Sequence, residues 1–403
     1  MKRNLTFVLI FLSSLVFAQH QVGHKQLTFT DPARSNRSIP CDVFYPATTA
    51  GEDVPMATGQ FPLLVFGHGF IMGDPDLYQY LWDAFAVKGY ICVFPTTENG
   101  SIFPPPNHLE FGLDLSFLSV QVNAENTQSA SFFYGKLTGK TAIMGHSMGG
   151  KAAFIGVGEG NSEADVIVTM GAAISNPPIG TAVDVLGEYA NQVSIPNLVI
   201  SGEFDCVAAP DDNQKPLYDT CLSACKTHVT ILGGGHCYFA SQAGSGMMSC
   251  ESGESCSSSF TIDRPTQNAT VLEFLEDYLD YYLKSNSAAG VSFLAYLTSS
   301  PKITYNRECG TTWAEQLAKD PGSLTLSPNP ATNSLHIDAI TEKPGSVTVS
   351  IYDVQGKVVM TYIFDNSGYV FSTDIDISQL PTGLYLTIVQ SGMNKYTERL
   401  VKQ

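Results

Sequence analysis

A serine with a glycine two positions away on either side is the feature of this chain that most clearly suggests chemistry. It lies in segment 145–149, Gly-His-Ser-Met-Gly, after the apolar run 141–144 and before the small-residue run 150–154. So tight a turn between a strand and a helix has no room for side chains at the glycines, and it exposes the serine oxygen. The helix N-terminus also favours developing negative charge. Ser147 is therefore predicted to be a nucleophile, the alternative being a glycine-rich turn that carries an incidental serine.

Two further polar residues could activate this serine. Asp205 follows the apolar run 197–202, and His236 follows the run 227–231 and a glycine-rich loop. Each is thus expected at the C-terminal end of a parallel strand, where open α/β sheets place their active sites. The order Ser, Asp, His along the chain is one of the known orders for a catalytic triad. We predict that Ser147, Asp205 and His236 are catalytic; the alternatives are a helix N-cap at Asp205 and an ordinary loop histidine at His236.

Acyl transfer by serine also needs N–H donors for the oxyanion. The backbone N–H of Met148, directly after the serine, is predicted to be one donor, and that of Phe70, at the end of an early strand, the other. Gly69 is the alternative to Phe70, and His68 is expected to brace this loop. Substrate-binding positions are predicted at the apolar residues Phe70, Met148 and Val207, although buried core residues would look the same in sequence.

The elements that must position these residues alternate between strand-like and helix-like patterns from residue 19 to 310. Such alternation predicts an α/β catalytic domain whose mainly parallel sheet is covered by helices. Strands are expected at 63–66, 90–94, 142–144, 166–170, 198–201 and 229–232. Helices are expected at 77–88, 113–125 and 265–283. Segment 241–259 is rich in Gly, Ser and Cys and is expected to form a long surface loop held by disulfides.

The N-terminus is typical of an exported protein. A charged start, a short apolar core and small residues before Ala18 predict a cleaved signal peptide at 1–18. The apolar run is shorter than the roughly 20 residues that span a bilayer, so a membrane anchor is the weaker interpretation. No later segment is apolar enough to span a membrane.

Nine cysteines suit this route, because disulfides form outside the cytoplasm. Cys206 directly follows the predicted acid and Cys237 the predicted base, so we expect disulfides to fasten both loops. The sequence leaves their partners open, and the odd total leaves at least one cysteine without an intramolecular partner. No paired CxxC or His-x-x-x-His spacing predicts a metal site, and no cofactor is expected.

The charge balance narrows the range of ligands. Acidic residues number 38 against 21 basic ones, a net charge of −17. This excess argues against nucleic acid and anionic lipid as ligands, since both carry negative charge. It is compatible with a neutral or apolar substrate.

Short alternating strands replace the helical periodicity after a linker at 311–323. Examples at 346–352 and 383–389, separated by turn signals, predict a small all-β sandwich at 324–403. Three of its segments resemble the C-terminal sorting domain of the type IX secretion system: Leu326-Ser327-Pro328-Asn329-Pro330-Ala331, Ile351-Tyr352-Asp353-Val354-Gln355-Gly356-Lys357 and Leu380-Pro381-Thr382-Gly383-Leu384-Tyr385. The resemblance implies that this secretion machinery exports the chain from a Gram-negative bacterium to the cell surface or beyond. A carbohydrate-binding or linker-like sandwich is the alternative.

The catalytic part also resembles a known family. Four segments carry the resemblance: Val65-Phe66-Gly67-His68-Gly69, Gly145-His146-Ser147-Met148-Gly149-Gly150, Asp205-Cys206-Val207-Ala208-Ala209-Pro210 and Gly233-Gly234-Gly235-His236. They are similar to the α/β-hydrolase branch of cutinase-like polyester hydrolases, poly(ethylene terephthalate) hydrolases and chlorophyllases. The resemblance implies an α/β-hydrolase fold, a triad of Ser147, Asp205 and His236, and oxyanion donors at Phe70 and Met148. His146 differs from the Trp that polyester-degrading members commonly have before the nucleophile.

These observations lead to one main functional hypothesis. The chain is expected to be a secreted serine carboxylic-ester hydrolase that acts through an acyl-enzyme on a neutral, hydrophobic ester, either a small molecule or a polymer such as a polyester. Two alternatives stay open, namely an acyltransferase on the same fold and a non-catalytic surface-binding protein.

Overall fold

The computed structural model describes residues 20–100, 104–176, 182–244, 250–309, 324–340, 345–366, 370–392 and 394–403. The signal peptide expected at 1–18 and the linker expected at 311–323 lie outside these residues. Within the described part of the chain, every helix is too short or too polar to cross a membrane.

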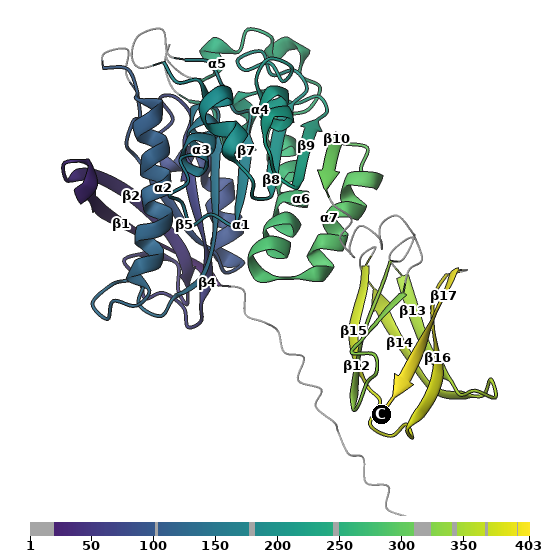
Figure 1. Ribbon diagram of the computed structural model, residues 1–403. Helices are drawn as coiled ribbons and strands as arrows, with labels where there is room; N and C mark the ends of the chain where they lie inside the picture. The colour runs from purple at the N-terminus through teal and green to yellow at the C-terminus, as the bar shows by residue number, and fades with distance from the viewer. Residues whose placement is uncertain are drawn as a thin grey trace, which may run out of the picture.

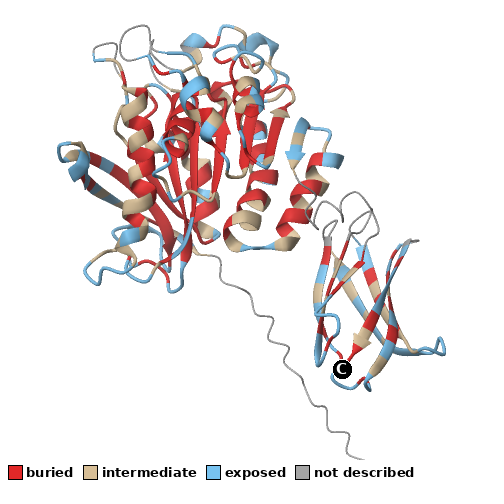
Figure 2. Ribbon diagram, in the orientation of Figure 1, coloured by how far each residue is buried: buried red, intermediate tan, exposed pale blue. Residues whose placement is uncertain are grey.

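A ten-stranded sheet organises the first part of the chain (Figure 1), in the order β10-β9-β8-β7-β6-β4-β5-β2-β1-β3. Its central strands are β4 (Phe61–Gly67), β5 (Ile91–Pro95), β6 (Leu137–His146), β7 (Val166–Met170), β8 (Asn197–Gly202) and β9 (Cys225–Ile231). All neighbours among them pair in parallel. The mainly parallel sheet predicted from the apolar runs is confirmed. Figure 2 shows why the runs are so apolar, since these strands are buried along most of their length.

The strands that flank this parallel region were not predicted, and most of them pair antiparallel with their neighbours. On one side β1 (Gln21–Asp31) and β2 (Arg37–Ala47) form a hairpin, and the short β3 (Gly51–Glu52) pairs with β1. On the other side β10 (Ile303–Cys309) pairs with β9. β1 and β10 mix polar and apolar residues because much of each strand is exposed, so neither produces a continuous apolar run.

Helices cover both faces of the sheet. The face formed with α1 (Gln79–Val87), α6 (Arg264–Lys284) and α7 (Ser287–Ser299) encloses one apolar core. The other face is covered by α2 (His108–Glu125), α3 (Met148–Gly158) and α4 (Gln214–Thr220). Short helical turns occupy Pro32–Arg34, Pro75–Tyr78, Val185–Tyr189, Ala190–Gln192, Cys237–Phe239, Cys250–Gly253 (α5) and Ser257–Ser259. The helices predicted at 113–125 and 265–283 are confirmed within α2 and α6, and the one predicted at 77–88 is confirmed as α1, although its first residues belong to the turn Pro75–Tyr78; α7 was not predicted.

The C-terminal part forms two antiparallel sheets with a core of their own, which confirms the predicted all-β sandwich. One sheet contains β11 (Leu324–Ser327), β12 (Ser334–Ile340) and β15 (Val370–Asp376). The other contains β14 (Val358–Asn366), β13 (Gly345–Tyr352), β16 (Gly383–Ser391) and β17 (Asn394–Lys402).

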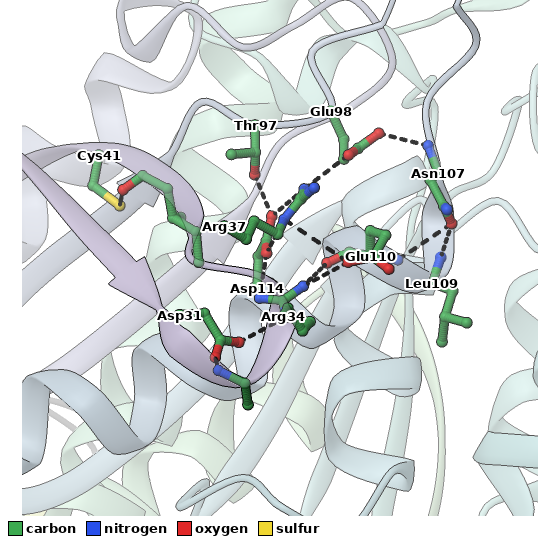
Figure 3. A network of polar contacts seen from close by, with 12 residues as sticks. Asp31, Arg34, Arg37, Cys41, Thr97, Glu98, Asn107, Leu109, Glu110 and Asp114 are labelled. Atoms are coloured by element: carbon green, nitrogen blue, oxygen red, sulfur yellow. Dashed lines mark hydrogen bonds and ion pairs between the residues drawn. The ribbon is translucent and has the colours of Figure 1, made fainter.

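A buried carboxylate on α2 fastens the β1–β2 hairpin to the catalytic part, as Figure 3 shows. The side chain of Asp114 is fully buried and accepts hydrogen bonds from Arg34 at 2.6 Å and from Arg37 at 2.7 and 2.8 Å. The hydroxyl of Thr97 donates a further bond at 2.6 Å. Asp114 thus compensates its own desolvation with two guanidinium groups and a hydroxyl.

The same network extends to the loops near the predicted oxyanion donor. Arg37 also binds Glu98 at 2.8 Å, in the loop after β5. The adjacent Asn99 accepts hydrogen bonds from the backbone N–H groups of Ile71 at 2.8 Å and Gly73 at 2.7 Å. The loop after β4, which contains Phe70, is therefore held by a loop that the ion pairs fix in place.

We expect Asp114→Ala to lower the free energy of unfolding by about 3–5 kcal/mol, because it removes the carboxylate shared by Arg34 and Arg37. Urea unfolding followed by circular dichroism measures this loss. Lys215→Ala is the control, since the Lys215–Asp219 pair is half exposed and should add nothing measurable. Equal stability of the two variants would contradict the role given to Asp114.

Candidate active site

The turn between β6 and α3 holds Ser147 in an unusual main-chain conformation. Its φ is 55° and its ψ is −118°, and its N–H donates to the carbonyl of Met170 at 3.0 Å. A non-glycine residue in such a conformation costs about 1–3 kcal/mol, which the surrounding structure must supply. Ser147 directly precedes the N-terminus of α3, so its oxygen lies where the helix dipole favours negative charge.

Close main-chain packing explains the two glycines of the turn. A Cβ atom on Gly145 would lie 2.2 Å from the carbonyl oxygen of Gly149. A Cβ atom on Gly149 would lie 2.0 Å from the carbonyl oxygen of Gly67, on β4. Neither position accommodates a larger residue, as the sequence predicted.

The three predicted catalytic residues lie together at the C-terminal ends of the parallel strands. The Nε2 atom of His236 lies 2.9 Å from the Oγ atom of Ser147, and its Nδ1 atom lies 2.7 Å from Oδ2 of Asp205. All three are buried, with exposed fractions of 7% for Ser147, 3% for Asp205 and 1% for His236. The carboxylate can hold the proton on Nδ1, which leaves Nε2 free to accept the proton of the serine.

The second oxygen of Asp205 is fixed by its own loop. It accepts hydrogen bonds from the backbone N–H groups of Val207 at 3.0 Å and Ala208 at 2.7 Å. With both oxygens bound, the carboxylate has a single orientation toward His236. The side chain of Val207 is 43% exposed.

The loop after β4 contains Gly69 and Phe70, the two candidates for the second oxyanion donor, and their contacts differ. The N–H of Gly69 donates to the hydroxyl of Tyr78 at 3.0 Å, so that N–H is already engaged. Phe70, the next residue, is 40% exposed, whereas Met148, the first residue of α3, is 3% exposed. His68 is fully buried between the carbonyl oxygens of Gly69 and Thr97, at 2.7 and 2.9 Å, and burial lowers its pKa. This position suits a bracing role.

The main chain around His236 is held by side chains from α6. Gln267 accepts from the N–H of Gly235 at 3.0 Å and donates to its carbonyl at 2.9 Å. Asn268 donates to the carbonyl of Tyr238 at 2.6 Å. Arg264 donates to the carbonyls of Cys237 at 2.5 Å and Ala240 at 3.2 Å. The loop therefore has an ordered path although it contains little regular structure.

Disulfides fasten the loops that contain Asp205 and His236, as predicted from the positions of Cys206 and Cys237. Cys206 pairs with Cys256 and Cys237 pairs with Cys250, so both partners lie in the segment 241–259. A third disulfide, Cys225–Cys309, joins β9 to β10. The described free cysteines, Cys41, Cys92 and Cys221, are all buried. Among the described residues there is also no group of three or more His, Cys, Asp or Glu side chains arranged to hold a metal ion.

Two side chains that contact the main chain of His236 gave no clear signal in the sequence. Glu254 accepts from its N–H, and His146 lies 3.2 Å from its carbonyl oxygen through Nε2. A single glutamate in a loop rich in Gly, Ser and Cys fits no motif. The histidine before the nucleophile was visible only as a departure from tryptophan.

Comparisons with known proteins identify two families that match this chain. Residues 41–252 match the PET hydrolase-like family, and residues 325–403 match the secretion system C-terminal sorting domain. The chain is also 25% identical over 287 residues to a protein from Chenopodium album described as chlorophyllase type 0. That match covers 65% of this chain and 80% of the relative.

Removal of the disulfides between the catalytic loops and segment 241–259 should destabilise the chain. The double variant Cys206→Ser/Cys256→Ser is expected to lose about 2–4 kcal/mol of unfolding free energy, because its unfolded state is no longer constrained. Melting curves with and without reductant provide the measurement. Cys221→Ser, which removes a free thiol, serves as the control, and reductant should not lower its melting temperature more than that of the unchanged protein. A melting curve of the unchanged protein that reductant does not shift would rule out stabilisation by these bonds.

Proposed function

The chain belongs to the PET hydrolase-like family, and on this basis we propose that it is a serine carboxylic-ester hydrolase that uses Ser147, His236 and Asp205. It is a secreted hydrolase, since residues 325–403 form a sorting domain for type IX secretion to the cell surface or the extracellular space. The observation that carries the proposed mechanism is the continuous hydrogen-bonded series from Asp205 through His236 to Ser147, at 2.7 and 2.9 Å.

In the first half of the reaction, the serine oxygen attacks the ester carbonyl. His236 accepts the serine proton at Nε2, and Asp205 stabilises the imidazolium that forms. The backbone N–H groups of Met148 and Phe70 donate to the oxyanion of the tetrahedral intermediate. His236 then returns the proton to the departing alcohol as the carbon–oxygen bond breaks, which leaves an acyl group on Ser147.

In the second half, water takes the place of the alcohol. His236 removes a proton from this water, whose oxygen attacks the acyl carbonyl and forms a second tetrahedral intermediate. The bond to Ser147 breaks, and His236 returns the proton to the serine oxygen. The carboxylic acid leaves and the enzyme regains its starting state.

The proposed substrate is a neutral, hydrophobic ester, either a small molecule or a polyester. Phe70 and Val207 support this choice, since both are apolar residues that remain exposed, at 40% and 43%. We propose that they contact the substrate together with Met148. The net charge of −17 also disfavours an anionic substrate.

The purified protein is expected to hydrolyse p-nitrophenyl esters, tested as a series from acetate to dodecanoate. Ser147→Ala should lose at least about 10³-fold in kcat, because no nucleophile is left to form the acyl-enzyme. Substrate contacts with the exposed apolar residues Phe70 and Val207 should favour longer acyl chains over acetate. Transfer of the acyl group to an added alcohol in preference to water would favour an acyltransferase instead, and no turnover at all would favour a binding protein.

Asp205→Asn is expected to reduce kcat by about 10⁴-fold while the fold is retained, because an amide cannot hold the required tautomer of His236. Asp211→Asn, an equivalent change at an exposed aspartate, is the control and should keep the original kcat. Steady-state kinetics and circular dichroism of both variants give the comparison. Similar kinetics in the two variants would exclude Asp205 from the mechanism.

A further inference from the structure

Two buried side chains outside the triad contact the main chain of His236, one at its N–H and the other at its carbonyl oxygen. The carboxylate of Glu254 accepts from the N–H of His236, and the ring of His146 contacts its carbonyl oxygen at 3.2 Å. We propose that Glu254 and His146 are positioning residues that together clamp the main chain of the catalytic base. This inference rests on the proposed function, because it assigns His236 the role of base.

The carboxylate of Glu254 is well placed to hold two consecutive residues. One of its oxygens accepts from the N–H of His236, and the other accepts from the N–H of Cys237 at 3.0 Å. The residue is only 3% exposed, and this burial raises the pKa of its carboxyl group. A buried carboxylate that accepts from two consecutive N–H groups fixes the orientation of their peptide planes, and this fixes the position of the His236 side chain.

Covalent bonds hold this acceptor beside the loops that it serves. Cys250 and Cys256 flank Glu254 in sequence, and they form disulfides with Cys237 in the base loop and Cys206 in the acid loop. Segment 250–256 therefore cannot move away from the base without also moving the residues next to it. The disulfides provide the attachment, and Glu254 provides the hydrogen bonds to the base.

The protonation of His146 follows from its partners. The ring is fully buried, and burial lowers its pKa well below the ordinary value, so it is neutral and carries one N–H. The carbonyl of His236 can only accept, which places the hydrogen on Nε2. The bare Nδ1 then accepts from the hydroxyl of Tyr78 at 2.9 Å, because a ring nitrogen at this distance is a better acceptor than the other contact of that hydroxyl, the sulfur of Met72 at 3.6 Å.

This arrangement connects the base to the loop of the proposed oxyanion donor. The hydroxyl of Tyr78, which donates to His146, accepts from the N–H of Gly69 at 3.0 Å. A continuous series of hydrogen bonds thus runs from Gly69, next to Phe70, through Tyr78 and His146 to His236. The clamp therefore fixes the base relative to both the nucleophile, which follows His146 directly, and the oxyanion loop.

The first test is Glu254→Gln in the full chain, with the p-nitrophenyl ester best hydrolysed by the unchanged protein as substrate. We expect kcat to fall about 10- to 100-fold with KM within about twofold, because displacement of the base affects the chemical step more than binding. Glu203→Gln is the matched control: Glu203 accepts from the N–H of Gly233, at 2.8 Å in the same loop, but does not contact His236. Its kcat should be unchanged.

A pH profile separates positioning of the base from general support of the fold. Among the described residues, the charged and titratable groups that contact His236 or the residue after it are Asp205, Glu254, Arg264 and the neutral His146, and Arg264 is itself paired with Glu251. Loss of the negative charge at Glu254 disfavours the imidazolium. The fall in kcat/KM at low pH should therefore move to lower pH in Glu254→Gln but not in Glu203→Gln.

Tyr78→Phe tests the other side of the clamp without altering a histidine. It removes the hydroxyl that orients His146, and we expect kcat to fall about tenfold. Tyr80→Phe is the control, because the hydroxyl of Tyr80 contacts only the sulfur of Met170 among the described hydrogen bonds, at 3.7 Å. Unchanged kcat in both Glu254→Gln and Tyr78→Phe would overturn the proposed clamp.

Failure of the clamp and failure of the proposed function give different results. Turnover that Ser147→Ala abolishes supports the function, and in that case only the variant-to-control ratios decide on the clamp. If the unchanged protein hydrolyses no ester, the function is wrong, and hydrogen–deuterium exchange of the peptide 232–240 decides on the clamp. Faster exchange in Glu254→Gln than in Glu203→Gln would support it, and equal exchange would overturn it.

Discussion

The close approach of main chains at Ser147 is the constraint on which the rest of the catalytic part depends. Strand β4, strand β6 and helix α3 meet there with only glycine between them, at Gly67, Gly145 and Gly149. The serine adopts a φ of 55° that it would not adopt alone. Burial of the central strands between two helical layers supplies the stabilisation that offsets this strain.

The loops that carry the other two members of the candidate triad are held in place by side-chain hydrogen bonds rather than by close main-chain packing. Asp205 and His236 lie in loops after β8 and β9, where no long helix begins at once to fix the chain. Side chains that bind main-chain groups take over this role, as Gln267, Asn268 and Arg264 do from α6. Each such contact satisfies a backbone group that the buried loop would otherwise leave unpaired.

The sequence predicted the parts of the fold that rest on local patterns. The buried parallel strands are continuous apolar runs, and the glycines around Ser147 follow from the local geometry of the turn. The sequence did not predict contacts between residues that are far apart in the chain. Glu254 meets His236 only after the chain folds, and the partners of Cys206 and Cys237 depend on where segment 250–256 lies. The ion pair between Arg37 and Asp114 was likewise not predicted, because it joins residues far apart in the chain.

The Cys225–Cys309 disulfide has a mechanical consequence. It joins Cys225 of β9 to the opposed Cys309 of β10. The disulfide transmits any force applied to the chain beyond Cys309 directly to β9, which lies inside the sheet between β10 and β8. Export by a machinery that binds the C-terminal domain would apply such a force. Strand β10 therefore cannot separate from β9 one hydrogen bond at a time. If a protease cuts the chain after Cys309, the new C-terminus stays covalently attached to β9.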